Sequence, residues 1–171
     1  MRSNWRGILK ILDIQHVRDG KVIWSEQNIH NLLHASGEQF MLLCAFDNDG
    51  NVVPANYYFG LDNRTVVAVT DTMASISSTE PTSGGYTRQT VASSGGFTVE
   101  AVSGIYRAVG PILTFNATGI GYGPVKNLFL TTASDNSGYL LSTAVLSSSV
   151  TLTSGDSINL RMSIQLADIS L

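Results

Sequence analysis

"DSINLRMSIQLADI", residues 156–169, is the cleanest alternation of apolar and polar side chains in the sequence. Successive side chains of an extended strand point to opposite faces of a sheet. One face of this segment would therefore carry only apolar residues, Ile158, Leu160, Met162, Ile164 and Leu166. The other face would carry Asn159, Arg161, Ser163 and Gln165. The pattern predicts a strand with one face in a core and the other in water.

Working outward from this strand, most of the chain after Tyr57 has the same character. Short apolar or alternating runs are separated by turns rich in Gly, Ser, Asn and Asp at intervals of about ten residues, a spacing typical of sandwiches and jelly rolls. We therefore predict a mainly β protein, a β-sandwich or jelly-roll-like domain. The further strand candidates are 57–61, 85–92, 96–102, 106–118, 125–133 and 138–147.

The N-terminal region reads as a β-hairpin. Asp19-Gly20 is a strong short-turn signal between the two alternating runs, because both residues can adopt a positive φ. In the first run, Leu12, Ile14 and His16 fall on one predicted face. We expect residues 1–27 to form a hairpin arm and residues 28–171 to form the sandwich domain.

One segment predicts a convincing helix. In "NIHNLLHASGEQFMLLCAF", residues 28–46, the apolar residues fall near helical spacing. Asn31 or Ser36 could cap the helix, and Gly37 weakens its middle, so that the helix could begin only at Ser36. A single helical turn could also form at "DTMAS", residues 71–75.

Composition excludes several partners. Charged residues make up 13% of the chain, against roughly 25% in an ordinary soluble domain, and the net charge is −3. Nucleic-acid binding needs a cationic stripe that the sequence lacks. No apolar run approaches the ~20 residues of a membrane span, and no signal peptide is evident. Cys44 is the single cysteine, which excludes an internal disulfide. A weakly charged surface rich in Ser and Thr is typical of a protein that assembles with copies or partners. The alternative is a stable β domain that does not assemble.

Catalytic motifs are weak throughout. His30 and His34 have the i, i+4 spacing that binds zinc from a helix, with Glu38 one turn further on. The zincin pattern requires a Glu directly after the first His, where this chain has Asn31. The glycine-rich "GIGYGP", residues 119–124, matches neither a dinucleotide fingerprint nor a P-loop. We predict no catalytic residue, no metal site and no cofactor, and therefore no enzyme.

The stretch "STEPTSGGYTRQTV", residues 78–91, contains a Gly-Gly pair that could cradle a ligand or turn a corner. No adjoining helix offers N-terminal amides to an anion. The pair is better interpreted as a bend that delivers Tyr86, Arg88 and Thr90 to one face of the next strand.

The succession "NLLHASGEQFMLL" (31–43), residues 56–89, "GPVKNLFLTT" (123–132) and residues 137–166 resembles small virion structural proteins of tailed bacteriophages. The likeness covers roughly residues 28–168 and is closest to capsid decoration or cement proteins. Its most recognisable parts are "EPTSGGYTRQ" (80–89) and "GPVKNLFL" (123–130).

The resemblance implies a β-sandwich or jelly-roll module made in the host cytoplasm and placed on the outer capsid surface of the virion. The implied partners are the major capsid protein and copies of the chain itself, as a homodimer or homotrimer. Candidate interface residues lie in the N-terminal hairpin, where Trp and Arg would be typical contact residues: Trp5, Arg6, Ile8, Leu9, Ile11 and Trp24. The alternative is that the hairpin folds back and both tryptophans complete the core.

Two other functions stay open. Similar proteins also occur as tail, collar or fibre components, and residues 62–69 and 119–124 would then be candidate tips that touch a host receptor. A small metal-dependent or carbohydrate-active hydrolase would have to use His30, His34 and Glu38.

Overall fold

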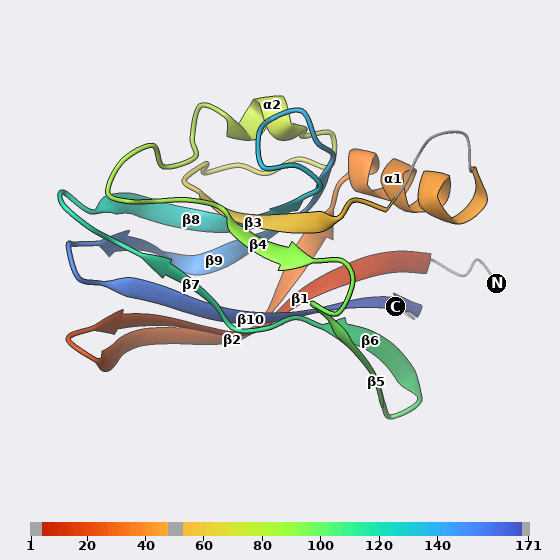
Figure 1. Cartoon of the computed structure of the whole chain (residues 1–171), viewed down its shortest axis with the longest axis horizontal. Coiled ribbons are helices and arrows are strands. Elements are labelled where there is room, and N and C mark those ends of the chain that lie inside the picture. The colour runs from red at the N-terminus through yellow and green to blue at the C-terminus, as the bar shows by residue number, and fades with distance from the viewer. Residues whose placement is uncertain (1–4, 48–52, 169–171) are drawn as a thin grey trace.

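The computed structural model describes residues 5–47 and 53–168 and folds them into two antiparallel sheets, which lie one above the other in Figure 1. The prediction of a mainly β, sandwich-like protein is confirmed. Sheet A contains β1 (Trp5–Arg18), β2 (Lys21–Leu33), β10 (Ser157–Asp168), β6 (Ile105–Val109), β5 (Thr98–Val102) and β7 (Leu113–Asn116). Sheet B contains β4 (Gln89–Ala92), β3 (Asn56–Asp62), β8 (Tyr122–Thr131), β9 (Leu140–Leu152) and the end of β2.

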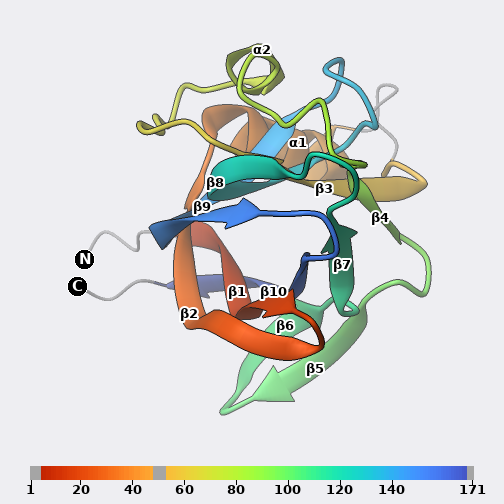
Figure 2. The ribbon, with the colours of Figure 1, turned by 90° about the vertical axis from the view of Figure 1, so that its left-hand side faces the viewer.

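Strand β2 belongs to both sheets. It pairs with β1 as far as His30 and then with β9 over Asn31–Leu33, so that it closes one side of the sandwich (Figure 2). Near this change of partner, Asn28 has a positive φ of 56°. Asn tolerates this conformation better than most residues, which explains how the strand can turn from one sheet toward the other.

The N-terminal hairpin forms at the predicted turn, where Asp19 and Gly20 have φ values of 50° and 71°. The hairpin does not stand apart from the sheet. Strand β1 lies between β2 and β10 and pairs with β10 along nearly its whole length. An antiparallel sheet stabilises an interior strand through both of its edges, so the hairpin is part of the sandwich.

A β-bulge in β1 changes which residues face the core. The register against β10 shifts between Ile11 and Asp13, which leaves Leu12 as the extra residue. Ile11 and Ile14 are both buried, whereas Leu12 is only half-buried. Strict alternation placed Leu12 on the core face and missed Ile11, because a bulge inverts the alternation on one side of itself.

The main helix, α1 (Ala35–Phe46), begins one residue before the later of the two predicted starts. The residues before it are strand rather than helix. Residues up to Leu33 pair with β9, and His34 is the N-cap of α1. His30 and His34 therefore do not lie on one helix, as their spacing had predicted. A short second helix, α2 (Met73–Ile76), forms where one helical turn was predicted, and Thr72 and Ser75 cap it reciprocally.

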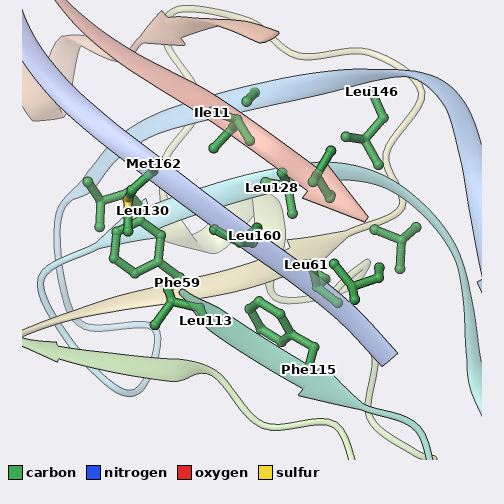
Figure 3. Close-up of a cluster of buried hydrophobic side chains, with 14 of the residues drawn as sticks. Ile11, Phe59, Leu61, Leu113, Phe115, Leu128, Leu130, Leu146, Leu160 and Met162 are labelled. Carbon is green, nitrogen blue, oxygen red and sulfur yellow. The ribbon is translucent and has the colours of Figure 1, made fainter. Parts of the chain in front are cut away.

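The core lies between the two sheets (Figure 3). Phe59 and Leu61 of β3 and Phe115 of β7 are fully or almost fully buried there with residues of β1, β8 and β10. A smaller cluster lies between α2 and the opposite face of sheet B and consists of Met73 and Ile76 of α2, Phe129 of β8 and Leu140 of β9. Sheet B is thus covered on both faces, which holds the loops on its outer side in place.

The predicted strand 106–118 is interrupted. Strand β6 ends at Val109 and β7 begins at Leu113, with Gly110-Pro111 between them. Proline cannot donate a backbone hydrogen bond to a ladder, which is why the run divides there. Both strands pair with β10, β6 near its C-terminal end and β7 near its N-terminal end.

Candidate functional site

Buried carboxylates in this protein are satisfied by neighbouring cations. Arg64 contacts Asp62 and Asp71, with Nε–Oδ2 2.5 Å and Nη1–Oδ2 2.7 Å. Arg18 makes two hydrogen bonds to Asp156, and His16 Nε2 lies 3.0 Å from the same carboxylate. These hydrogen bonds, above all those from Arg18, hold the pKa of Asp156 far below its usual range. Carboxylates held in this way stabilise loops and turns and offer neither a lone pair nor a proton to a reaction.

Another enclosed polar cluster surrounds Arg88. Its guanidinium binds Glu80, and it also donates to the carbonyl oxygens of Ala133 and Asp135. The hydroxyl of Tyr86 donates to Glu80 at 2.7 Å and accepts the N–H of Leu61. Burial and the nearby carboxylate raise the pKa of Tyr86, so its hydroxyl stays protonated.

An open hollow of about 500 Å³ borders this cluster, lined by Tyr58, Thr87, Thr90 and the 134–136 loop among others. Glu80 and Arg88 in its lining are bound to each other, and the exposed carboxylate of Asp135 accepts hydrogen bonds from Ser137. The geometry therefore describes a strut that fastens the segment 78–91 to the 132–138 loop. It offers a substrate no unpaired acid or base.

The histidine pair does not form a metal site. The backbone of His30 lies in β2, and His34 is buried with both ring nitrogens in use. Nδ1 of His34 faces the carbonyl oxygen of Ala68 at 3.0 Å, and Nε2 lies 2.7 Å from the hydroxyl of Thr143. Glu38 is exposed on α1. Among the side chains that the structure describes, which do not include that of His30, no group of three His, Cys, Asp or Glu residues could hold a metal.

The Gly84-Gly85 pair forms a corner, with φ values of 66° and 74°. The carbonyl oxygen of Gly84 accepts a hydrogen bond from the N–H of Thr118. A Cβ on Gly84 would lie 2.2 Å from the carbonyl oxygen of Gly121, so the space that a ligand would need is filled by another turn. The two glycine-rich segments of the sequence therefore pack against each other.

The β5–β6 hairpin has several exposed apolar side chains. It projects from the end of sheet A, away from sheet B (Figures 1 and 2). Ser103 and Gly104, both at positive φ, make its two-residue turn. Val99 is 69% exposed and Tyr106 is 71% exposed, although both are apolar enough for a core. Apolar side chains that gather on a projecting element are typical of a protein-contact surface.

Two of the six predicted contact residues of the N-terminal hairpin lie against the core. Ile11 is 1% exposed within the core, so its side chain presents no surface to a partner, and Trp24 is half-buried against the same core. Trp5, Arg6, Ile8 and Leu9 lie in β1, and their side chains are outside the described part of the structure. Whether these four contact another protein stays a prediction.

The exposed residues Val99 and Tyr106 were missed, although the sequence contains a signal for them. "VEAVSGIYRA", residues 99–108, has Ser-Gly between two alternating runs, which is a typical two-residue hairpin. What the sequence does not show is that this hairpin lies beyond the core.

No helix in the part of the chain that the structure describes is long and apolar enough to cross a membrane. In comparisons with known proteins, no protein-family model matches the sequence, and a search of curated proteins finds no match.

Proposed function

We propose that this chain is a non-enzymatic structural protein of a phage virion, a capsid decoration or cement protein that stabilises the shell by bridging capsid subunits. The observation that carries the proposal is the β5–β6 hairpin, which extends a sheet beyond the core and leaves Val99 and Tyr106 open to a partner. The resemblance of residues 28–168 to such proteins supplies the identity of the partner, the major capsid protein.

The charge distribution supports a protein partner. Arg18, Arg64, Arg88 and Arg107 are each bound to a carboxylate of this chain. Four of the ten cationic side chains are thus paired within the chain, and the net charge is −3, so the proposal includes neither nucleic acid nor membrane. It includes no cofactor. The protein would act on the outer capsid surface, after synthesis in the host cytoplasm, by contact area and strand pairing.

The test is a binding experiment with capsid shells of the cognate phage prepared without this protein. The purified chain is added in increasing amounts, the shells are pelleted, and the bound copies are counted. We expect saturation at hundreds of copies per particle. The double variant Val99→Ser/Tyr106→Ser should lose binding at least about tenfold, whereas Val66→Ser, in an equally exposed loop, should not. Absence of saturable binding by the unaltered chain would overturn the proposal.

A tail, collar or fibre component is the second candidate, and one observation favours it. Ile120, at the tip of the glycine-rich turn 119–124, is 86% exposed, as expected for a loop tip that touches a receptor. The copy number separates the two candidates. A handful to a few dozen copies per virion would indicate the tail, and labelling of Ile120→Cys virions would then locate the protein there by microscopy.

A further inference from the structure

Strand β5 forms one end of the strand order, and β6 is its only partner among the described strands. Natural proteins protect such edges with Lys, Pro or bulges. Residues 98–102, "TVEAV", contain no Lys, Pro or bulge, and their one charged side chain, Glu100, is bound to Arg107 of β6. At the opposite end of the order, β4 has only four residues, and Arg88 just before it is bound into the 132–138 loop. The unprotected edge is therefore that of β5.

The register of the hairpin divides its side chains between two faces. Val99 pairs with Ala108 and Ala101 with Tyr106, which gives one face that is wholly apolar apart from the phenol hydroxyl. The opposite face carries Thr98, Val109 and the ion pair between Glu100 and Arg107, with Nε–Oε1 2.7 Å. The hairpin thus carries no net charge and repels a copy of itself only weakly.

We propose that two copies of this chain join edge to edge through β5, in an antiparallel pairing centred on Val99. A two-fold axis at Val99 places Thr98 of each copy opposite Glu100 of the other, and the threonine hydroxyl can donate to the carboxylate. Pairing centred on Glu100 would instead oppose two carboxylates, which is destabilising. Thr98 as donor and Glu100 as acceptor both belong to β5. The edge of β5 is therefore complementary to the same edge of a second copy.

The dimer also explains why the hairpin can extend beyond the core. A two-stranded hairpin is only marginally stable in water, and more strands with an apolar face are needed for stability. Pairing through β5 makes a four-stranded ribbon and brings the apolar faces of both copies into one surface. The inference rests on the proposed function only for the expectation that copies of this chain associate. It adds that they associate through the edge of β5.

A disulfide tests the register directly. Directly opposed residues of an antiparallel pair have Cα atoms about 4.5–5.5 Å apart, within the range that a disulfide spans. In a Cys44→Ser background, we expect Val99→Cys to form a covalent dimer on mild oxidation. Tyr106→Cys, equally exposed but on β6, should stay monomeric, because the two β6 strands are separated by both copies of β5. Failure of Val99→Cys to cross-link, or equal cross-linking of Tyr106→Cys, would overturn the proposal.

Sedimentation velocity gives a second measurement without a covalent bond. Val99→Lys places two ammonium groups at the axis and should raise the dimer dissociation constant at least about tenfold, with circular dichroism unchanged because Val99 is exposed. Val66→Lys, 77% exposed before substitution, should dimerise like the unaltered chain. Shell binding by a chain that never dimerises would overturn this inference alone. A dimer that binds no shell would overturn the proposed function alone.

Discussion

Arg88 and Glu80 are joined by two hydrogen bonds, Nε–Oε1 2.8 Å and Nη2–Oε2 2.6 Å, and both side chains are about nine-tenths buried. The guanidinium carbon lies 5.3 Å from the centre of the Phe129 ring. This pair connects the segment after α2 to the 132–138 loop, and both cover the outer face of sheet B. Bidentate hydrogen bonds between charged groups are strong and directional, and removing one partner of a buried pair leaves an uncompensated charge.

Arg88→Ala should therefore destabilise the fold strongly. Removing one partner of a buried pair leaves the carboxylate of Glu80 buried and uncompensated, at a cost of about 3–5 kcal/mol. Urea unfolding at pH 7 followed by circular dichroism measures the loss. The matched control is Arg107→Ala, whose pair with Glu100 is 28% and 42% exposed. We expect Arg107→Ala to lower the free energy of unfolding by less than about 1 kcal/mol. Equal losses in the two variants would contradict a stabilising role for the buried pair of Arg88 and Glu80.

Gly84→Ala should cost more stability than Gly119→Ala, although both glycines have φ near +60°. A left-handed residue with a Cβ costs about 1–2 kcal/mol at either position. At Gly119 a Cβ meets nothing within 4 Å, whereas at Gly84 it would lie 2.2 Å from a backbone oxygen. Thermal unfolding should place Gly84→Ala clearly below Gly119→Ala. The reverse order would mean that the two turns do not pack together.

His34 should make the stability depend on pH in the mildly acidic range. Burial lowers the pKa of His34, so the folded protein binds its proton less readily than the unfolded chain does. Stability is then fully present above the unfolded pKa of about 6.5 and falls as the pH drops below it, by at most about 1.4 kcal/mol per pH unit.

The comparison that isolates this effect is His34→Gln. We expect the variant to be less stable at pH 7, because the contacts with Ala68 and Thr143 are altered. Below the unfolded histidine pKa, from about pH 6.5 down to about pH 5, its unfolding free energy should change less than that of the unaltered chain. Urea midpoints at several pH values give both curves, and parallel curves would show that His34 does not titrate differently in the two states.

Local patterns predicted the elements well where one face meets water. The alternation of residues 156–166 indicated the inner face of β10, and Asp19-Gly20 located the first hairpin. Gly37 weakened the helical pattern enough to place the start of α1 within one residue. These features depend on side chains close together in the sequence, and periodicity and turn chemistry are sufficient to read them.

Long-range pairing accounts for what the sequence could not show. Leu12 does not lie on the core face, because a bulge forms there when β1 pairs with β10. Residues 28–33 have helical spacing, yet they form a strand because Ile29 and His30 pair with β1 and Asn31–Leu33 pair with β9. This is a tertiary effect that overrides local preference. The exposure of Val99 likewise follows from where sheet A extends beyond sheet B. No local pattern contains that information.

The central position of β1 has a consequence for biosynthesis. Its neighbour on one side, β10, is translated last among the described strands, and it is β10 that also receives β6 and β7. Folding must wait for contacts between the two extremes of the chain, a topology that slows the search for the native state. While it is still attached to the ribosome, the nascent chain would present the unpaired edge of β1, and we expect it to be a chaperone client during that interval.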